Sequence, residues 1–314
     1  MLPEMYLRAK TFLFLMLLVC IPVFNEEESL ERIVNEVRAQ SLWHESGERE
    51  MIIGLNGCTD KSAEISYKLA REDPCIKVLE LEMKGKNHAL NEMVKISRAK
   101  DFENIFFLDA DIILEKGVLK KLDNALKRSP PEMAIASATA RPFEEKFGRF
   151  ALHRRYLLEK GMASIQNYVH GRCYAMRRSE AVKVAFPKNQ KIFDDAFLTC
   201  LYWGRFKVLN SALVRYRVPN YRDWLVQMAR RRINIQQLYH GYPELRRPLT
   251  RWLVASRQLK MQHAGKSVRE KLGGKFPAFI ESISDPLIYI KMRSSMRNSN
   301  DSWPKIRSTK MKPR

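Results

Sequence analysis

The chain has 314 residues, of which 45% are hydrophobic. This composition excludes a disordered chain, and the length allows one large domain or two smaller ones. The five cysteines include no Cys-x-x-Cys pair, so neither a zinc site nor a disulfide framework is indicated. Such cysteine usage favours a reducing compartment, and we expect a cytoplasmic protein.

The charge is strongly positive and unevenly distributed. The formal net charge is +21, and residues 241–314 hold 17 Lys and Arg against 5 Asp and Glu, a net of +12. A field of this sign attracts nucleic acid, anionic lipid or phosphorylated ligands. Because no zinc finger, RNP or basic-zipper pattern accompanies the charge, we expect no nucleic-acid partner.

An apolar run from Phe12 to Phe24 follows Arg8 and Lys10, as in a signal peptide. As a helix this run would span only about 20 Å, short of the roughly 30 Å hydrocarbon core of a bilayer. Pro22 also disfavours a continuous helix. We therefore expect the first strand of a sheet, with a signal or membrane-touching segment as the alternative. No other stretch is long and apolar enough to span a bilayer.

Strand-like and helix-like patterns alternate up to about residue 140. The predicted strands are 17–23, 51–55, 76–81, 104–111 and 133–138. Between them lie helices with apolar residues at helical spacing, the first being Leu30, Ile33, Val34 and Val37. This alternation predicts a parallel sheet with helices on both faces.

The later part of the chain loses this rhythm. Short strands are predicted at 173–176 and 206–214, and a helix at 223–238. We expect a catalytic domain over residues 1–240, a basic helical extension over 241–298 and a disordered tail over 299–314. In the extension Arg246, Arg247, Arg251, Arg257, Lys260 and Lys266 would face anionic lipid, with Trp252, Leu253 and Leu259 as interfacial anchors.

The most informative stretch is the strand predicted to lead into Asp109-Ala110-Asp111. Its apolar run suits a strand buried inside a parallel sheet, which places both acids at a carboxyl end, where α/β sheets bind ligands. Two carboxylates so close would repel each other unless a cation lay between them. Mg²⁺ or Mn²⁺ accepts such oxygen ligands and keeps positions free for phosphate. The alternative is a solvated acidic turn.

Polar residues also follow the other predicted strands and should meet these acids at one edge of the sheet. The segments are Pro22-Val23-Phe24-Asn25-Glu26, Asn56-Gly57-Cys58-Thr59-Asp60 and Lys84-Gly85-Lys86-Asn87-His88-Ala89-Leu90-Asn91. Polar side chains there suit a base and ribose, while a Lys and a metal suit a diphosphate. This would be a nucleotide site without the Gly-rich signatures of dinucleotide-binding or P-loop proteins.

This ordered set resembles the inverting family 2 glycosyltransferases, which have a GT-A fold, over roughly residues 17–235. The turn at Asn56 is similar to the family's Asp-Gly-Ser-Thr-Asp, with an amide replacing an acid that usually contacts uracil. The acids at 109 and 111 are similar to its Asp-x-Asp metal motif. Asp194-Asp195-Ala196-Phe197-Leu198 resembles Glu-Asp-x-x-Leu. Gln227-Met228-Ala229-Arg230-Arg231 resembles Gln-x-x-Arg-Trp, and the missing Trp puts stacking of an acceptor sugar in doubt.

The resemblance implies an α/β fold of the GT-A type, with a mixed, mainly parallel sheet flanked by helices. It implies a general base at Asp195 and a metal at Asp111 assisted by Asp109. Nucleotide contacts are implied for Pro22, Val23, Glu26, Asn56, Lys86 and Asp109. Contacts with the acceptor or the diphosphate are implied for Asp194, Gln227, Arg230, Arg231 and Gly171, with Arg172 beside Gly171.

The implied reaction is metal-dependent transfer of a sugar from a nucleotide-sugar, by default a UDP-sugar, to a hydroxyl acceptor by single displacement. The cofactor would be Mn²⁺ or Mg²⁺. A carbohydrate or lipid-linked acceptor, and a peripheral place on the inner face of the cell membrane, follow from the basic extension as hypotheses.

Three alternatives remain open. A processive polysaccharide synthase core is one, although such enzymes usually carry several transmembrane helices, which we do not expect here. A nucleotidyltransferase also uses acids and metal on an α/β sheet, but it would release diphosphate rather than a nucleoside diphosphate. A non-catalytic binding module with basic surfaces for nucleic acid is the third, and the presence of all the acids argues against it.

Overall fold

The structure is a computed structural model that describes residues 16–143, 167–188 and 191–256. Its strands are β1 (Met16–Val23), β2 (Arg49–Asn56), β3 (Ile76–Leu81), β4 (Phe102–Leu108), β5 (Ile113–Leu114), β6 (Ile135–Pro142), β7 (Cys173–Arg177) and β8 (Phe206–Tyr216). Its helices are α1 (Leu30–Arg38), α2 (Ser41–Glu45), α3 (Ser62–Glu72), α4 (Lys86–Ser97), α5 (Val118–Lys127), α7 (Arg178–Ala181), α8 (Asp194–Leu201), α9 (Tyr221–Gly241) and the short η1 (Pro243–Leu245).

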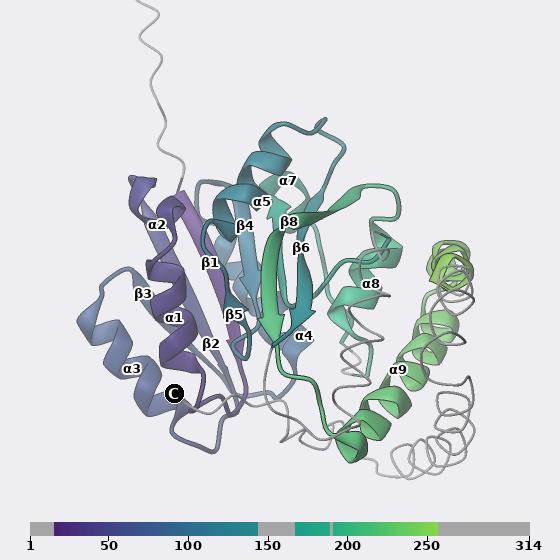
Figure 1. Ribbon diagram of the computed structural model, residues 1–314, viewed down its shortest axis with the longest axis horizontal. Helices are drawn as coiled ribbons and strands as arrows, with labels where there is room; N and C mark the ends of the chain where they lie inside the picture. The colour runs from purple at the N-terminus through teal and green to yellow at the C-terminus, as the bar shows by residue number, and fades with distance from the viewer. Residues whose placement is uncertain (1–15, 144–166, 189–190, 257–314) are drawn as a thin grey trace, which may run out of the picture.

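The strands form one eight-stranded sheet in the order β3-β2-β1-β4-β7-β6-β8-β5, and Figure 1 shows the sheet with helices packed around it. The pairs β1–β2, β1–β4, β2–β3 and β6–β8 are parallel. The pairs β4–β7, β6–β7 and β5–β8 are antiparallel. The expected mixed, mainly parallel sheet is therefore confirmed, and β4, which leads to the Asp-x-Asp motif, lies inside it.

Both faces of the sheet are covered. The side chains of β1 illustrate this, because they alternate between two hydrophobic cores. Val19 and Ile21 belong to a core shared with α1, α3 and α5. Leu18 and Cys20 belong to a second core shared with α4 and α8. Because successive strand residues point to opposite faces, an unbroken apolar strand is what a sheet between two helical layers requires.

The observed elements differ from the predicted ones in a few places. The predicted strand 104–111 included Asp109 and Asp111. β4 ends at Leu108, so both acids lie in the loop that follows the strand. The backbone nitrogen of Asp109 extends the hydrogen bonding between β4 and β7 by donating to the carbonyl of Arg172 at 2.8 Å. The elements β5, α2 and α7 were not predicted, because segments of two to five residues carry no readable period.

The chain after α9 packs back onto the second core instead of standing apart from it. Leu245, Leu249 and Trp252 are at most 5% exposed and belong to that core. Their spacing marks the inner face of the helix over residues 246–256. Trp252 is only 2% exposed, so its prediction as an interfacial anchor was wrong: its ring is needed inside the protein.

Several expectations lie outside the described residues, namely Arg8, Lys10, the positions Arg257, Leu259, Lys260 and Lys266, and the tail over 299–314. The predicted first strand is confirmed over the described part of its apolar run. Within the described ranges, no helix combines the length and the apolar character needed to cross a bilayer.

Candidate active site

The loops that follow β1, β2 and β3 are joined to one another at the carboxyl edge of the sheet. Oδ1 of Asn25 accepts a hydrogen bond from the backbone nitrogen of Thr59 at 2.7 Å. Oδ1 of Asn56 accepts one from the backbone nitrogen of Gly85 at 2.6 Å. Asn25 has a φ of 56°, a left-handed conformation that Asn adopts more readily than most residues. The strand ends therefore converge as expected.

Three predicted nucleotide-contacting residues have side chains engaged within the protein. Val23 is fully buried in the core, and its carbonyl accepts a hydrogen bond from Sγ of Cys58 at 3.4 Å. Glu26 is 8% exposed and accepts a hydrogen bond from Oγ of Ser29 at 2.8 Å, just before α1. The amide oxygen of Asn56 has one lone pair left beyond its bond to Gly85. These contacts favour a structural contribution, and the nucleotide role of the three residues stays a prediction.

The ammonium group of Lys86 lies between two acidic segments. Its Nζ is 2.6 Å from Oδ1 of Asp109 and 3.2 Å from Oδ2 of Asp194. The same group donates to the carbonyl of Gly171 at 3.4 Å. Pro22 and these four residues line one small pocket. Five residues predicted from different motifs are thus brought together.

The electrostatics of this acidic cluster are dominated by burial. Burial lowers the pKa of Lys86, but Asp109 and Asp194 outweigh it and raise that pKa well above its ordinary value. Burial raises the pKa of Asp194 to about 6, while Lys86 lowers it and Asp195 raises it. Burial and the charge of Asp109 raise the pKa of Asp111 to about 6. Besides Lys86, Arg172 lowers the pKa of Asp111, and the carboxylates still outnumber these two cations, which suits the site to a further cation.

Asp195 lies in the first turn of α8, where the helix dipole favours a carboxylate. Its Oδ1 accepts a hydrogen bond from the backbone nitrogen of Ala196 at 2.7 Å. A Cβ added to Gly171 would lie 2.8 Å from the Cβ of Asp195 and 3.1 Å from Oδ2 of Asp194. The close approach of these two segments therefore requires glycine at position 171.

The helix α9 carries Gln227, Arg230 and Arg231. Burial lowers the pKa of Arg230 to about 10, with Asp223 acting in the opposite direction. The guanidinium of Arg231 lies over the ring of Trp252, 5.9 Å from its centroid. Among the residues that the structure describes, no ion pair joins Arg230 or Arg231 to the acidic cluster. Their acceptor or diphosphate roles stay predictions.

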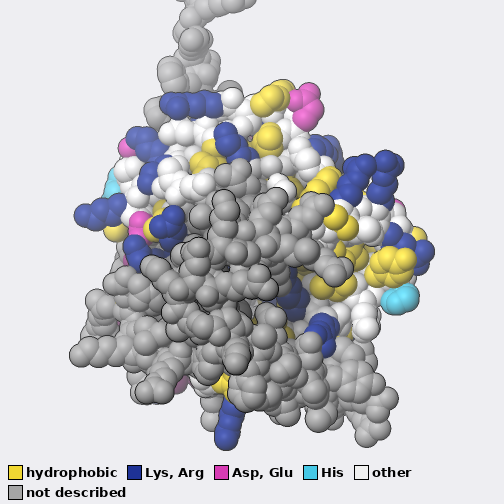
Figure 2. All heavy atoms as spheres, turned by 45° about the vertical axis from the view of Figure 1, so that its right-hand side comes forward, with side chains coloured by type: hydrophobic (Ala, Val, Ile, Leu, Met, Phe, Trp, Pro, Cys, Tyr) yellow, Lys and Arg dark blue, Asp and Glu magenta, His cyan; other side chains and the backbone are white. Residues whose placement is uncertain are grey.

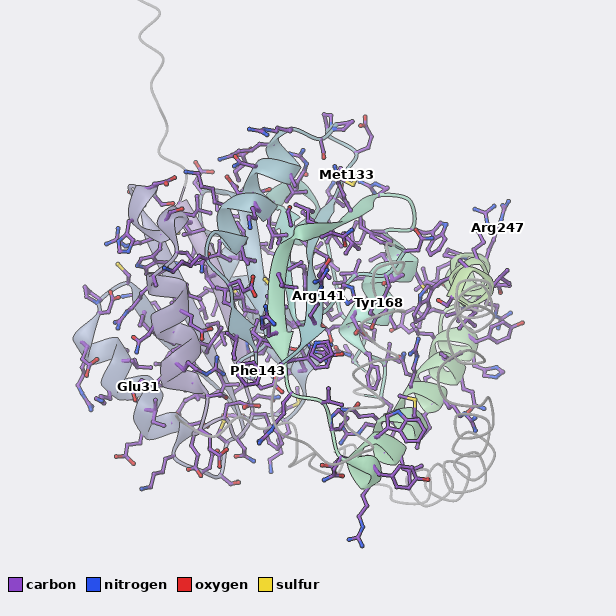
Figure 3. All side chains as sticks on the ribbon, viewed as in Figure 1. Glu31, Met133, Arg141, Phe143, Tyr168 and Arg247 are labelled. Carbon is purple, nitrogen blue, oxygen red and sulfur yellow. The ribbon has the colours of Figure 1, made fainter. Side chains whose placement is uncertain are left out.

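Sequence analysis did not place two aromatic residues in the site: Tyr168, which contacts Asp195, and Trp252, which contacts Tyr168. The hydroxyl of Tyr168 donates a hydrogen bond to Oδ2 of Asp195. The ring of Tyr168 stacks on Trp252, with centroids 5.2 Å apart, and Figure 3 labels Tyr168 on the side of the sheet where α8 lies. No local pattern indicated either residue, because Tyr168 ends a charged, aromatic segment without a period and Trp252 comes from beyond α9.

Replacing Lys86 with Met should destabilise the protein, because Asp194 would remain buried, and Asp109 partly buried, without their cation. We expect a loss of about 1–3 kcal/mol in the free energy of unfolding at pH 7.5, measured by urea denaturation, since solvent screens the partly exposed pair with Asp109. The loss should shrink at pH 5, where protonation reduces the repulsion between the carboxyl groups. The control is Lys95→Met, whose ion pair with Glu92 is exposed at 3.3 Å. Equal effects of the two changes would contradict this account.

Replacing Asp111 with Asn should stabilise the metal-free protein at neutral pH. Because the folded-state pKa of Asp111 is raised to about 6, this group lowers stability as the pH rises from about 4 to about 6. In EDTA, Asp111→Asn should add about 1–3 kcal/mol to the free energy of unfolding at pH 7.5 and almost nothing at pH 4. The exposed Asp101→Asn is the control, and a pH-independent gain would argue against the prediction.

Comparison with known proteins identifies the family of this chain. The model described as "Glycosyl transferase family 2" matches residues 18–186, more than half of the chain. A poly-beta-1,6-N-acetyl-D-glucosamine synthase of Staphylococcus aureus (strain COL) is 32% identical over 119 residues, covering 38% of this chain and 26% of that protein. The corresponding synthase of Staphylococcus epidermidis is 31% identical over 120 residues. The match thus spans about a quarter of the length of these relatives.

Two solved structures share the fold. A mannosyltransferase from Pyrobaculum calidifontis has a TM-score of 0.56 at 18% identity, covering 89% of this chain and 82% of that chain. TarS residues 1–349 from S. aureus has a TM-score of 0.51 at 15% identity, covering 88% and 78%. At these identities the likeness shows a shared fold of the GT-A type. Because the family model matches more than half of the chain, the protein belongs to glycosyl transferase family 2.

Proposed function

We propose that the protein transfers a sugar from a UDP-sugar to a hydroxyl acceptor by a single inverting displacement, with Asp195 as the general base. The observation that carries this proposal is the position of Asp195 next to Asp194 in the acidic cluster. Gly171 lies against both acids and has no side chain to fill the space beside them. A carboxylate at this place can take the proton of an attacking hydroxyl. Family membership favours this reaction over nucleotidyl transfer.

The donor sugar proposed for the first tests is N-acetylglucosamine. The curated relatives are named for a polymer of this sugar, and a TarS structure with a TM-score of 0.50 contains UDP-GlcNAc. The mannosyltransferase neighbour was solved with GDP-Man and Mn²⁺ instead. A shared fold therefore leaves the base open, and UDP rests on the relatives rather than on Asn56, whose oxygen already binds Gly85.

A divalent cation is the cofactor that we propose for this site. Within the described residues no group of three or more His, Cys, Asp or Glu side chains is arranged to hold a metal. Mg²⁺, however, needs only one or two carboxylates when phosphate oxygens complete its shell. Asp109 and Asp111 fit this need, because burial and their mutual repulsion raise the pKa of Asp111. When bound, Mn²⁺ or Mg²⁺ would stabilise the charge that collects on the leaving diphosphate.

The protein's own cations would assist at the same place. Lys86 is held beside Asp109 by its ion pair, and it would attract the phosphates of the donor to this edge of the sheet. Asp194 restrains Lys86 from the other side. Asp195 follows Asp194 in the chain, so a diphosphate attracted to Lys86 would lie close to the proposed base, and such proximity of the reacting groups favours a direct displacement.

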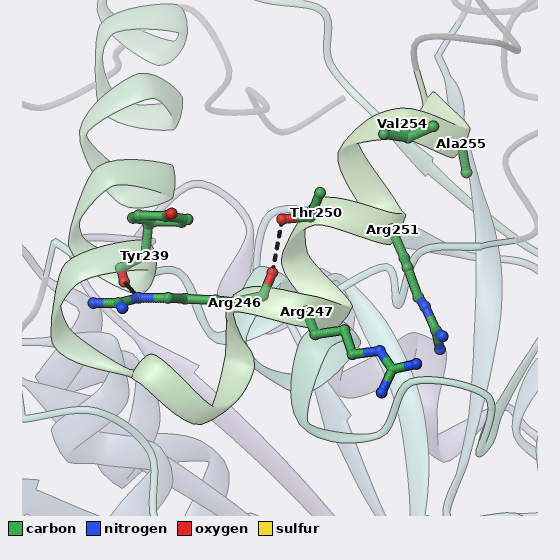
Figure 4. A pocket seen from close by; sticks show the side chains of 7 residues that line it. All are labelled: Tyr239, Arg246, Arg247, Thr250, Arg251, Val254 and Ala255. Atoms are coloured by element: carbon green, nitrogen blue, oxygen red, sulfur yellow. Dashed lines mark hydrogen bonds between the residues drawn. The ribbon is translucent and has the colours of Figure 1, made fainter.

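We also propose that the enzyme acts at an anionic membrane surface on a lipid or lipid-linked acceptor. Arg246, Arg247 and Arg251 line a surface pocket of about 570 Å³ together with Tyr239 and Val254. In Figure 4 Arg247 and Arg251 extend to the same side of their helix, and Figure 3 places Arg247 at the right-hand edge of the molecule.

Apolar side chains accompany these arginines. Tyr239 is 45% exposed and Val254 is 50% exposed, and the right-hand part of the face in Figure 2 shows basic side chains beside hydrophobic ones. Basic groups around exposed apolar side chains are the combination that binds anionic lipid surfaces. Peripheral attachment at the inner face of the membrane follows from this surface as part of the proposal.

The glycosyl-transfer proposal predicts that the parent protein releases nucleoside diphosphate from a member of a panel of UDP-, GDP- and dTDP-sugars with Mn²⁺ or Mg²⁺. Asp195→Asn should lower this rate by about 10²–10⁴-fold, because the amide cannot accept the proton. Thermal shifts should show that the variant still binds the nucleotide. The exposed Asp101→Asn is the matched control. Parental turnover by Asp195→Asn would overturn the base assignment, and release of diphosphate would indicate nucleotidyl transfer.

The membrane proposal predicts that the full chain sediments with phosphatidylglycerol-containing vesicles, less so in high salt. Arg247→Glu combined with Arg251→Glu should weaken binding by about thirtyfold or more, since each basic group contributes about 1 kcal/mol. The control is Lys68→Glu with Lys95→Glu, an equal charge change on exposed helical positions elsewhere. Binding to neutral vesicles that equals binding to anionic ones would refute this proposal.

A further inference from the structure

The carboxylate of Asp195 is held by two hydrogen-bond donors. Tyr168 donates its hydroxyl to Oδ2, and the backbone nitrogen of Ala196 donates to Oδ1 at 2.7 Å. Burial and, next, the charge of Asp195 raise the pKa of Tyr168 well above its ordinary value, so the hydroxyl keeps the proton that it donates. A carboxylate offers about four lone-pair positions, so an acceptor hydroxyl can still bind to it.

Tyr168 is itself held by aromatic contacts. Its ring is stacked on Trp252, with centroids 5.2 Å apart and an angle of 13° between the planes. The edge of His170 meets it from another side at 5.5 Å and 85°. Burial, followed by the charge of Arg172, lowers the pKa of His170 to about 3, so the imidazole beside Tyr168 is neutral. The phenol is therefore fixed on two sides by uncharged rings.

Trp252 contacts both Tyr168 and α9, and it lies in the last helix of the described chain. It is 2% exposed, and the guanidinium of Arg231 lies 5.9 Å from its ring centroid. Arg231 stands where the similar family motif has a Trp, so the indole in this part of the site comes from another segment. Being buried, Trp252 has no free face for a sugar and acts on the site only through its neighbours.

We infer that Tyr168 and Trp252 are positioning residues for Asp195: Tyr168 fixes the rotation of the carboxylate, and Trp252 fixes Tyr168. This inference rests on the proposed role of Asp195 as the general base. Asp194, Lys86 and Tyr174 also interact electrostatically with Asp195, and Arg231 does so with Tyr168. Loss of orientation at a reacting group slows the chemical step by up to about a hundredfold without weakening substrate binding.

The test is a set of variants of the full chain, assayed with the donor that the panel identifies. Tyr168→Phe keeps the stacking and removes the hydrogen bond, and Trp252→Leu removes the stacking. Each should lower kcat by about ten- to a hundredfold, with the KM for the donor and the Kd for UDP within about twofold of the parent. Trp252→Phe should restore most of kcat, because a smaller ring can still stack.

A double-mutant cycle separates positioning from general damage. Since Trp252 acts through Tyr168, the double variant Tyr168→Phe with Trp252→Leu should be no slower than Tyr168→Phe alone. In Tyr168→Phe the Kd for UDP should stay parental while kcat falls, a separation that general damage to the site would not produce. Multiplicative losses, or losses in Kd that match those in kcat, would overturn the inference.

The outcome can be distinguished from failure of the proposed function. If Asp195→Asn keeps parental turnover, the base assignment fails whatever Tyr168 does. If Asp195→Asn is inactive and Tyr168→Phe keeps the parental kcat, the base assignment stands and the positioning role is refuted. Should Trp252→Leu not fold, Tyr168→Phe and Trp252→Phe, which retain the aromatic packing, decide the question alone.

Discussion

The ion pairs of Lys86 hold the site together, because they join segments that lie far apart in the chain. Asp109 follows β4, Asp194 begins α8, and Lys86 begins α4. Without the ammonium group, the buried carboxylate of Asp194 and the partly buried one of Asp109 would lose the cation that they share. Because Asp195 is the next residue along α8, the same ion pairs also set where the proposed base lies.

The cluster carries more negative charge than the folded protein needs for its own stability. Burial raises the pKa of both Asp111 and Asp194 to about 6, which means that their ionised forms are disfavoured in the fold. Such groups persist at sites where a ligand supplies the missing positive charge. The surplus is therefore better explained by binding of a cation with a phosphorylated donor than by packing, whose demands an amide would meet equally well.

Much of the fold and part of the site follow from local sequence patterns. The apolar stripe that begins at Leu30 predicts a helix with one buried face. The apolar run that leads to Asp109 predicts a buried strand, since a helix and a strand differ in the period of their apolar residues. Other outcomes depend on contacts that no period encodes. The carboxylate of Glu26 turns toward Ser29, and Tyr168 reaches Asp195 from a segment without a pattern. Only the folded arrangement of distant segments places these side chains.

The helix over residues 246–256 shows why the basic extension misled sequence reasoning in one respect. A pattern of Arg and Trp predicts a helix with cations and an indole on one membrane-facing surface, yet the two residue types lie on opposite faces here. Trp252 points inward to stack on Tyr168, whereas Arg247 and Arg251 line the outer pocket. This helix thus packs one face against Tyr168, which contacts Asp195, and exposes arginines on another face. Because both faces move together, the placement of the base depends on how this helix sits against the core.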